Sequence, residues 1–251
     1  MDIHYQIDGP ADAPVLVLSN SMGTTLSLWD PLMAALTTRF RVLRYDTHGH
    51  GQTRKRGKVT LAQLGEDVIS LLDHLAIDKA FFAGISVGGL TGLWLARFAP
   101  QRFYAIAVAN TAAKIGEQSG WLSRARTVRQ EGMGVVAAGT ADRWFTPAFR
   151  QHHPTVVEPL VHQLAVSQAE GYAQGCEALA AADLRAEVAE IHLPVLVIAG
   201  EFDPVTTVAD ADYLQQQIAG AQKVVLPASH LSNVETPEAF SAALLTFFSE
   251  V

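Results

Sequence analysis

A single serine, Ser86, lies among four glycines in the stretch FFAGISVGGLTG. The residues GISVG match the pattern G-x-S-x-G, with a strand-like apolar run before them and a helix-like apolar run after them. In that pattern the serine stands on a sharp strand-to-helix turn, where bulky neighbours would clash and the hydroxyl is exposed. The turn also places the serine at a helix N-terminus, where free N–H groups favour a developing negative charge. Because motif and context both match, we interpret Ser86 as a nucleophile rather than an incidental serine in a glycine-rich turn.

A serine nucleophile needs a base, and the base needs an acid that orients it. With this motif the three residues follow one another in the order serine, acid, histidine. Of the nine histidines only His230 follows the strand-like run PVLVIAG, and it lies in a loop after the run KVVLP, so it is the candidate base. The segment AGEFDPVTT offers two acids, Glu201 and Asp203. Its place in the loop favours Asp203, with Glu201 as the alternative.

Acyl transfer also requires two backbone N–H groups that bind the oxyanion of the tetrahedral intermediate. One is expected from Val87, directly after the nucleophile. The other is expected from the loop after an early strand, which here reads SNSMGTTLSLWD, residues 19–30.

Six short, nearly continuous apolar runs predict strands that are buried on both faces, as in a parallel sheet covered by helices. They are VLVLS (15–19), FRVLRY (40–45), AFFAG (80–84), YAIAVAN (104–110), PVLVIAG (194–200) and KVVLP (223–227). Helical patterns alternate with them; one begins at a capping box formed by Thr60 and Gln63, and the last begins at Pro237. The pattern predicts an α/β fold with a mostly parallel, doubly wound sheet.

The alternation of strands and helices lapses between about residues 114 and 190, where strand-like runs are missing and helical patterns dominate. We therefore expect one domain over residues 1–251, with a core of residues 1–113 and 191–251 and an inserted helical cap at residues 114–190.

The composition excludes several classes of function. The formal net charge is −7 and no basic run occurs, which argues against a nucleic-acid partner. Signal-peptide and membrane-span patterns are missing, and the single cysteine, Cys176, fits a reducing compartment, so we expect a cytoplasmic protein with no membrane partner. The histidines of DTHGHGQT lack the clustered acid of a metal site, and no G-x-G-x-x-G follows the first strand, so neither a metal nor another cofactor is expected. The oligomeric state does not follow from these features.

Five stretches resemble a known family: LSNSMGTTLSLWD, RYDTHGHGQT, GISVGGLTGLWLA, GYAQGCEALAAADLR and IAGEFDPVTT. Together with the order of the motifs, they make the chain similar to the α/β-hydrolases with a helical cap, and within these to the 3-oxoadipate enol-lactonases of aromatic catabolism. Ser19-Asn20 stand where many α/β-hydrolases have His-Gly. That alignment assigns the second oxyanion donor to the N–H of Ser21, with Met22 as the alternative.

The resemblance implies a serine hydrolase that converts a small, carboxylate-bearing enol-lactone, 3-oxoadipate enol-lactone, into 3-oxoadipate through an acyl-enzyme, without a metal or cofactor. A substrate carboxylate would need a cation. The segment DRWFTP offers Arg143 as that cation and Trp144 as an apolar wall. The rival cations are Arg124, Arg126 and Arg129. The alternative functions are a carboxylesterase, a cofactor-free haloperoxidase-like hydrolase, a C–C bond hydrolase and a non-catalytic ligand receptor.

Overall fold

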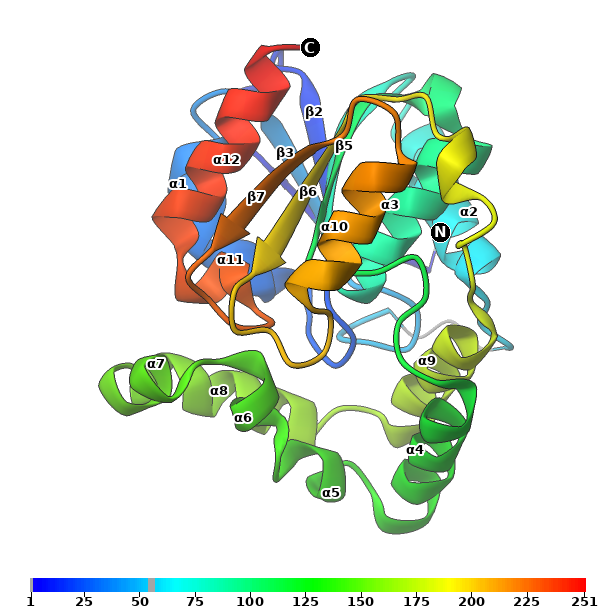
Figure 1. Ribbon diagram of the computed structural model, residues 1–251, viewed down its shortest axis with the longest axis vertical. Helices are drawn as coiled ribbons and strands as arrows, with labels where there is room; N and C mark the ends of the chain where they lie inside the picture. Colours follow the sequence, from blue (N-terminus) through cyan, green and yellow to red (C-terminus); the bar gives the residue numbers. More distant parts are fainter. Residues whose placement is uncertain (1, 54–56) are drawn as a thin grey trace.

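Seven strands form one sheet through the centre of the molecule in the computed structural model, which describes residues 2–53 and 57–251 (Figure 1). The strands are β1 (Tyr5–Asp8), β2 (Val15–Ser19), β3 (Arg41–Tyr45), β4 (Ala80–Ile85), β5 (Phe103–Ala109), β6 (Val195–Gly200) and β7 (Gln222–Leu226). Their order is β1-β3-β2-β4-β5-β6-β7, and every neighbouring pair is parallel except β1 with β3. The predicted mostly parallel sheet is confirmed. Met1 and residues 54–56 of the predicted single domain lie outside the described residues.

Strand β1 is the one strand of the sheet that the apolar runs did not predict. Its sequence, YQID, alternates between half-buried and exposed side chains. An edge strand covered on one face reads this way, because only every second side chain meets the core. By contrast, the side chains of β4 and β6 are buried throughout, which explains their continuous apolar runs.

Helices cover both faces of the sheet (Figure 1). On one face lie α1 (Asp30–Leu36) and α12 (Pro237–Ser249), and on the other lie α2 (Leu61–His74), α3 (Val87–Phe98) and α10 (Val208–Gln217). The short helix α11 (Ser232–Glu235) precedes α12, and single turns of 3-10 helix occupy η1 (Leu26–Trp29), η2 (Pro100–Arg102) and η3 (Val188–Glu190). Helix α2 begins where expected, because the Thr60 side chain accepts a hydrogen bond of 3.1 Å from the Gln63 N–H.

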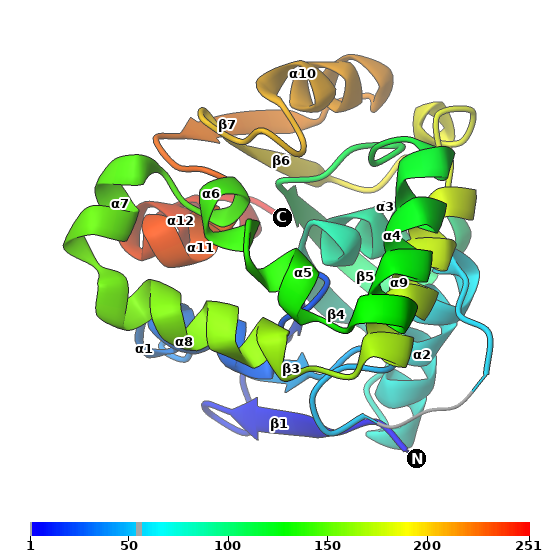
Figure 2. The same ribbon diagram turned by 90° about the horizontal axis from the view of Figure 1, so that it is seen from below.

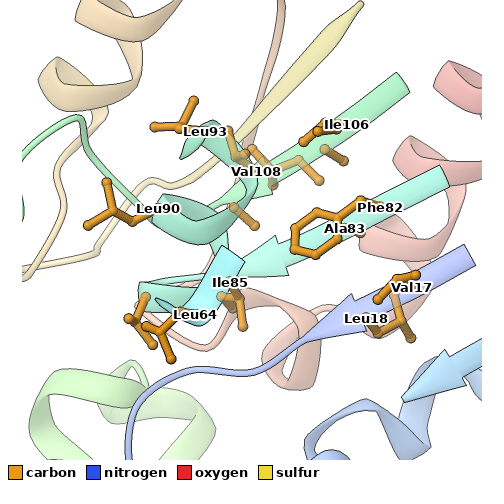
Figure 3. Packing of buried hydrophobic residues seen from close by; sticks show 14 of the residues in the cluster. Val17, Leu18, Leu64, Phe82, Ala83, Ile85, Leu90, Leu93, Ile106 and Val108 are labelled. Carbon is orange, nitrogen blue, oxygen red and sulfur yellow. The ribbon is translucent and has the colours of Figure 1, made fainter. Parts of the chain in front are cut away.

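The core between the sheet and α3 fixes the part of the fold that carries Ser86. Phe82 of β4 and Ile106 and Val108 of β5 lie on the side of the sheet that α3 covers, and Leu90 and Leu93 are buried side chains of α3 (Figure 3). All five side chains are fully buried. Each contributes about 1.5–3 kcal/mol by leaving water, so the strand-to-helix connection between β4 and α3 rests on a rigid base.

The chain between β5 and β6 is helical, apart from its connecting loops. It contains α4 (Gln118–Glu131), α5 (Gly134–Ala137), α6 (Thr140–Trp144), α7 (Pro147–His152), α8 (Pro154–Ala165) and α9 (Ala169–Ala181). These helices lie below the sheet in Figure 1, at the carboxyl ends of its parallel strands, and stand in front of it in Figure 2. We refer to them as the cap helices. The boundaries of a cap at residues 114 and 190 stay a prediction.

Helix α9 meets the core through two glycines one helical turn apart. A Cβ atom on Gly171 would lie 2.1 Å from the carbonyl oxygen of Gly49, and one on Gly175 would lie 2.8 Å from the sulfur of Met22. Gly49 itself has a φ of +72°, in the left-handed region. The closeness of these contacts sets the distance between α9 and the loops after β2 and β3. Among the described residues, no helix is both long enough and apolar enough to cross a membrane.

Candidate active site

Ser86 occupies the turn between β4 and α3 with a strained backbone. Its φ and ψ are +59° and −120°, values that a residue other than glycine rarely adopts. Such strain costs about 1–3 kcal/mol and persists only where the surroundings hold it. Here the Ser86 N–H donates to the Ala109 carbonyl at 2.9 Å, and the Thr111 hydroxyl donates to the Ser86 carbonyl at 2.8 Å. Ala109 is the last residue of β5 and Thr111 follows that strand closely, so the neighbouring strand holds the turn.

The glycines around Ser86 are a steric requirement of this turn. A Cβ atom on Gly84 would lie 2.2 Å from the carbonyl oxygen of Gly88, and one on Gly88 would lie 2.3 Å from the carbonyl oxygen of Ser19. The second contact joins the turn to the end of β2. Alanine at either position would force two backbone segments apart, because the atoms that its Cβ would meet belong to the main chain and cannot rotate away as a side chain could.

The three residues predicted as a triad lie in one chain of hydrogen bonds. His230 Nε2 is 3.0 Å from Ser86 Oγ, and His230 Nδ1 is 2.8 Å from Asp203 Oδ2. A carboxylate only accepts, so Nδ1 carries the hydrogen and Nε2 is free to accept from the serine hydroxyl. Asp203 follows β6 and His230 follows β7, and all three side chains are buried. A serine, a neutral imidazole and a carboxylate in this order can perform nucleophilic catalysis.

Asp203 is held ionised by its surroundings. Its Oδ1 accepts from the N–H groups of Val205 and Thr206, and its Oδ2 accepts from the Thr206 hydroxyl and the Asn110 amide as well as from His230. Burial raises the pKa of Asp203, but the hydrogen bond and charge of His230, with the Asn110 and backbone donors, outweigh it and leave the pKa below its ordinary value. The alternative acid, Glu201, is exposed, and His230 contacts Asp203 instead.

The loop after β2 is brought against the turn at Ser86. Ser21 is 2% exposed and lines the same cavity as Ser86, while Val87 is the first residue of α3. The Ser21 carbonyl accepts from both the N–H and the hydroxyl of Thr24, at 3.2 and 2.7 Å, which closes a tight turn. The Asn20 amide donates to the Tyr45 carbonyl at 2.7 Å, which ties the loop to β3. Met22 also lines the cavity, so the structure leaves both predicted donors, Ser21 and Met22, beside Ser86.

A cavity of about 310 Å³ lies between Ser86 and the cap helices. Its apolar lining from the cap includes Trp121, Trp144, Leu164 and Leu179. Its cationic lining consists of Arg124 from α4 and Arg143 from α6. A small cavity with an apolar wall and a few convergent polar groups is the usual form of a site for a small molecule.

The two arginines of the cavity have no carboxylate partner among the described residues. Arg143 donates to the Thr140 hydroxyl at 2.8 Å and to the Val136 carbonyl at 3.3 Å. Burial, and then the charge of Arg124, lower the pKa of Arg143. The Arg124 guanidinium lies over the Trp121 ring, 4.9 Å from its centroid. The structure thus brings two cations together that the sequence had offered as rivals.

The other rival arginines lie elsewhere. Arg126 is exposed and does not line the cavity. Arg129 forms ion pairs with Glu170 at 2.8 Å and Glu177 at 2.5 Å on the surface between α4 and α9. These pairs join two cap helices and leave Arg129 unavailable to a ligand in the cavity.

The described residues contain no group of three or more histidine, cysteine, aspartate or glutamate side chains that could hold a metal ion. His50 of the DTHGHGQT segment is buried, and its Nδ1 bonds the His48 carbonyl at 2.9 Å. Burial raises the pKa of the Cys176 thiol to about 12. The thiol therefore stays protonated at neutral pH, and Cys176 has no nucleophilic form there.

Comparison with known proteins places these features in context. Residues 14–237 match the family described as the alpha/beta hydrolase fold. The chain is 52% identical over 243 residues to 3-oxoadipate enol-lactonase 2 of Acinetobacter baylyi, covering 96% of this chain and 91% of that protein. It is 48% identical to 3-oxoadipate enol-lactonase 1 of the same organism, covering 95% and 90%. Among solved structures, the enol-lactonase from Burkholderia xenovorans LB400 superposes with a TM-score of 0.96 at 46% identity, covering 98% of this chain and 96% of that one.

Proposed function

The chain belongs to the α/β-hydrolase fold family, and from this premise we propose that it is a serine hydrolase that opens 3-oxoadipate enol-lactone to 3-oxoadipate. The observation that carries the proposal is the hydrogen-bonded chain of Ser86, His230 and Asp203, in which Ser86 and His230 line a small cavity together with two arginines that have no carboxylate partner among the described residues. The likeness to enol-lactonases over nearly the full length of the chain supports the choice of substrate.

In the proposed mechanism, His230 Nε2 takes the proton of Ser86 while the serine oxygen attacks the lactone carbonyl. The N–H groups of Val87 and Ser21 stabilise the tetrahedral oxyanion. The ring C–O bond then breaks, and the enol oxygen leaves with the proton from His230. The enol tautomerises to a ketone that is still part of the acyl-enzyme. A water molecule, deprotonated by His230, attacks the acyl carbonyl and releases the dicarboxylate, while Asp203 orients the imidazole and stabilises its charged form.

The substrate carboxylate is proposed to bind between Arg143 and Arg124, with Trp144 as the apolar wall. Both guanidinium groups line the cavity without a carboxylate partner among the described residues, so a ligand carboxylate would be their first ionic partner. Glu117 also lines the cavity, but its carboxylate pairs with Lys114 at 3.1 Å. Planar guanidinium groups bind carboxylates through two parallel hydrogen bonds, which fits recognition of an anionic lactone.

We also propose that residues 114–190 act as the cap that covers this site. The substrate is proposed to be a small molecule, and the enzyme is proposed to work in the cytoplasm in the degradation of aromatic compounds.

The proposal is tested by comparing kcat/KM for 3-oxoadipate enol-lactone with that for a neutral ester, p-nitrophenyl acetate. A preference for the enol-lactone supports the lactonase, whereas a preference for the neutral ester supports a carboxylesterase of the same fold. Labelling by a fluorophosphonate without turnover of either compound would support a ligand receptor.

The carboxylate subsite is tested with Arg143→Met and Arg124→Met. Each change removes charge-assisted hydrogen bonds of about 1.5–3 kcal/mol, so KM for the anionic lactone should rise about 10- to 100-fold. The kinetics with the neutral ester should stay within about threefold of wild type. The exposed Arg126→Met is the matched control and should change neither. Equal losses on both substrates would contradict the subsite.

A further inference from the structure

Asn110 is a buried amide at the carboxyl end of β5 that sequence analysis did not single out. It is the residue directly after β5, it is 1% exposed, and its φ of +44° lies in the left-handed region. Among residues with a side chain, asparagine adopts this region most readily, but it still does so at a cost. The backbone is held there by a hydrogen bond of 2.8 Å from the Asn110 N–H to the Ile198 carbonyl of β6.

The amide of Asn110 joins the loop of the acid to the loop of the base. Its Nδ2 donates to Asp203 Oδ2 at 3.0 Å and to the Ser229 carbonyl at 3.1 Å, and its Oδ1 accepts from the Ser232 hydroxyl. Ser229 and Ser232 flank His230 in the chain. Both hydrogens of the amide are used. The reverse orientation would turn Oδ1 toward two acceptors, so these partners determine which way the amide faces.

The fold leaves room for this bridge at Gly200, the last residue of β6. A Cβ atom there would lie 2.4 Å from the Ser229 carbonyl oxygen and 2.9 Å from Asn110 Nδ2. Any larger residue would push Ser229 and the Asn110 amide apart. Gly200 at the end of β6 and the strained Asn110 directly after β5 are therefore both required for the same set of contacts.

We propose that Asn110 is a positioning residue of the triad, whose amide fixes Asp203 relative to the loop of His230; this rests on the serine-hydrolase function proposed above. The Oδ2 atom of Asp203 receives three donors: His230 Nδ1, the Thr206 hydroxyl and Asn110 Nδ2. Thr206 belongs to the acid's own loop, so Asn110 is the donor that also holds the loop of the base. Without this amide, the loop of Asp203 and the loop of His230 lose the side chain that links them, so the carboxylate and the imidazole can shift relative to each other. Displacements of about 1 Å in such sites cost about 100-fold in rate.

The test uses Asn110→Ala and Asn110→Gly in the full chain. Both remove the amide, and glycine also removes the cost of the positive φ, so agreement between them isolates the side chain. The matched control is Asn233→Ala, because Asn233 is also fully buried and also donates to a backbone carbonyl, that of Leu28 at 3.1 Å. The readouts are the rate of Ser86 labelling by a fluorophosphonate, kcat and KM for p-nitrophenyl acetate, and the melting temperature.

We expect both Asn110 variants to lose about 10- to 100-fold in labelling rate and in kcat, with KM within about threefold of wild type. Asn233→Ala should lower the melting temperature but keep the labelling rate within about threefold. If either Asn110 variant folds and its Ser86 is labelled at the wild-type rate, the proposal is overturned. A wild-type protein that is neither labelled nor active would instead remove the serine-hydrolase function, and the positioning role with it.

Asn110→Asp provides a second, nearly isosteric test if the smaller residues do not fold. It keeps the acceptor for Ser232 but sets a second carboxylate against Asp203; among the described residues, Asp203 and His230 are the titratable groups in the hydrogen-bond chain that it joins. Two carboxyl groups at hydrogen-bond distance share one proton, because the like charges raise the pKa of one of them. While that proton is held, the new carboxyl group can donate to Asp203 as the amide does; once it is lost at higher pH, the donor is lost and kcat/KM should fall, which gives an alkaline decline that wild type lacks. An alkaline limb identical to that of wild type would overturn the proposal.

Discussion

Replacing Gly88 by alanine tests the steric argument for the turn at Ser86. A Cβ atom at position 88 would lie 2.3 Å from the Ser19 carbonyl oxygen, 2.6 Å from the Ser19 carbonyl carbon and 2.8 Å from the Asn20 carbonyl oxygen. Ordinary contact begins at about 3.4 Å, so the two backbones must separate by about 1 Å. Both neighbours are main-chain atoms, and a change of rotamer cannot relieve the contact.

The separation acts directly on the proposed oxyanion site. Ser19 and Asn20 lead into Ser21, and Gly88 follows Val87, so moving either backbone draws the two proposed N–H donors apart. A displacement of about 1 Å costs about 100-fold in rate, and loss of one oxyanion donor costs about 100- to 1,000-fold in kcat. We therefore expect kcat to fall at least about 100-fold. Overpacking should lower the free energy of unfolding by about 1–3 kcal/mol.

The assay is steady-state hydrolysis of p-nitrophenyl acetate, together with urea unfolding and fluorophosphonate labelling. Gly134→Ala is the matched control, because a Cβ atom there would meet nothing within 4 Å. The control should keep wild-type kcat and stability or gain slightly in stability, since alanine is the better helix former. A Gly88→Ala protein that folds and keeps kcat within about fivefold of wild type would refute the reasoning.

Three further changes test the acid, the contact between α9 and the core, and the surface ion pairs. Asp203→Asn should lower kcat by about 1,000- to 10,000-fold while the exposed control Glu201→Gln stays near wild type. Because the folded-state pKa of Asp203 is depressed, its stabilising contribution is present above about pH 4 and is lost as the pH falls through the folded-state pKa; urea unfolding should show a steeper acid loss in wild type than in Asp203→Asn. Gly171→Ala would place a Cβ atom 2.1 Å from the Gly49 carbonyl oxygen, so the melting temperature should fall and KM should rise as α9 shifts; an unchanged KM would disprove the link. Arg129→Ala should cost less than about 1 kcal/mol in urea unfolding, because its ion pairs are exposed, and a larger loss would contradict this account.

The features that could be predicted from the sequence depend on local patterns. Ser86 stands out because the strained turn admits only small neighbours, and His230 stands out because it is the one histidine after PVLVIAG. The central strands were predicted because burial on both faces makes their apolar character continuous. These signals survive in a single sequence since each is imposed by the backbone or by chain order.

The features that were missed depend on contacts between distant segments. Strand β1 is an edge strand, whose short alternating pattern is weak by itself. Asn110 ends the run YAIAVAN, and a polar residue at the carboxyl end of a buried strand was the one available signal. The partners of its side chain lie 93 to 122 residues away along the chain. The arginines of the cap were predicted as rivals, because only the tertiary arrangement of α4 and α6 reveals that Arg124 and Arg143 line one cavity.

The most direct test of the central claim is the loss of ultraviolet absorbance of 3-oxoadipate enol-lactone, with wild type and Ser86→Ala measured side by side and corrected for spontaneous hydrolysis. The account predicts rapid loss with wild type and the background rate with Ser86→Ala. A wild-type rate equal to the background, in protein that still hydrolyses aryl esters, would contradict the lactonase assignment while leaving the serine-hydrolase mechanism in place.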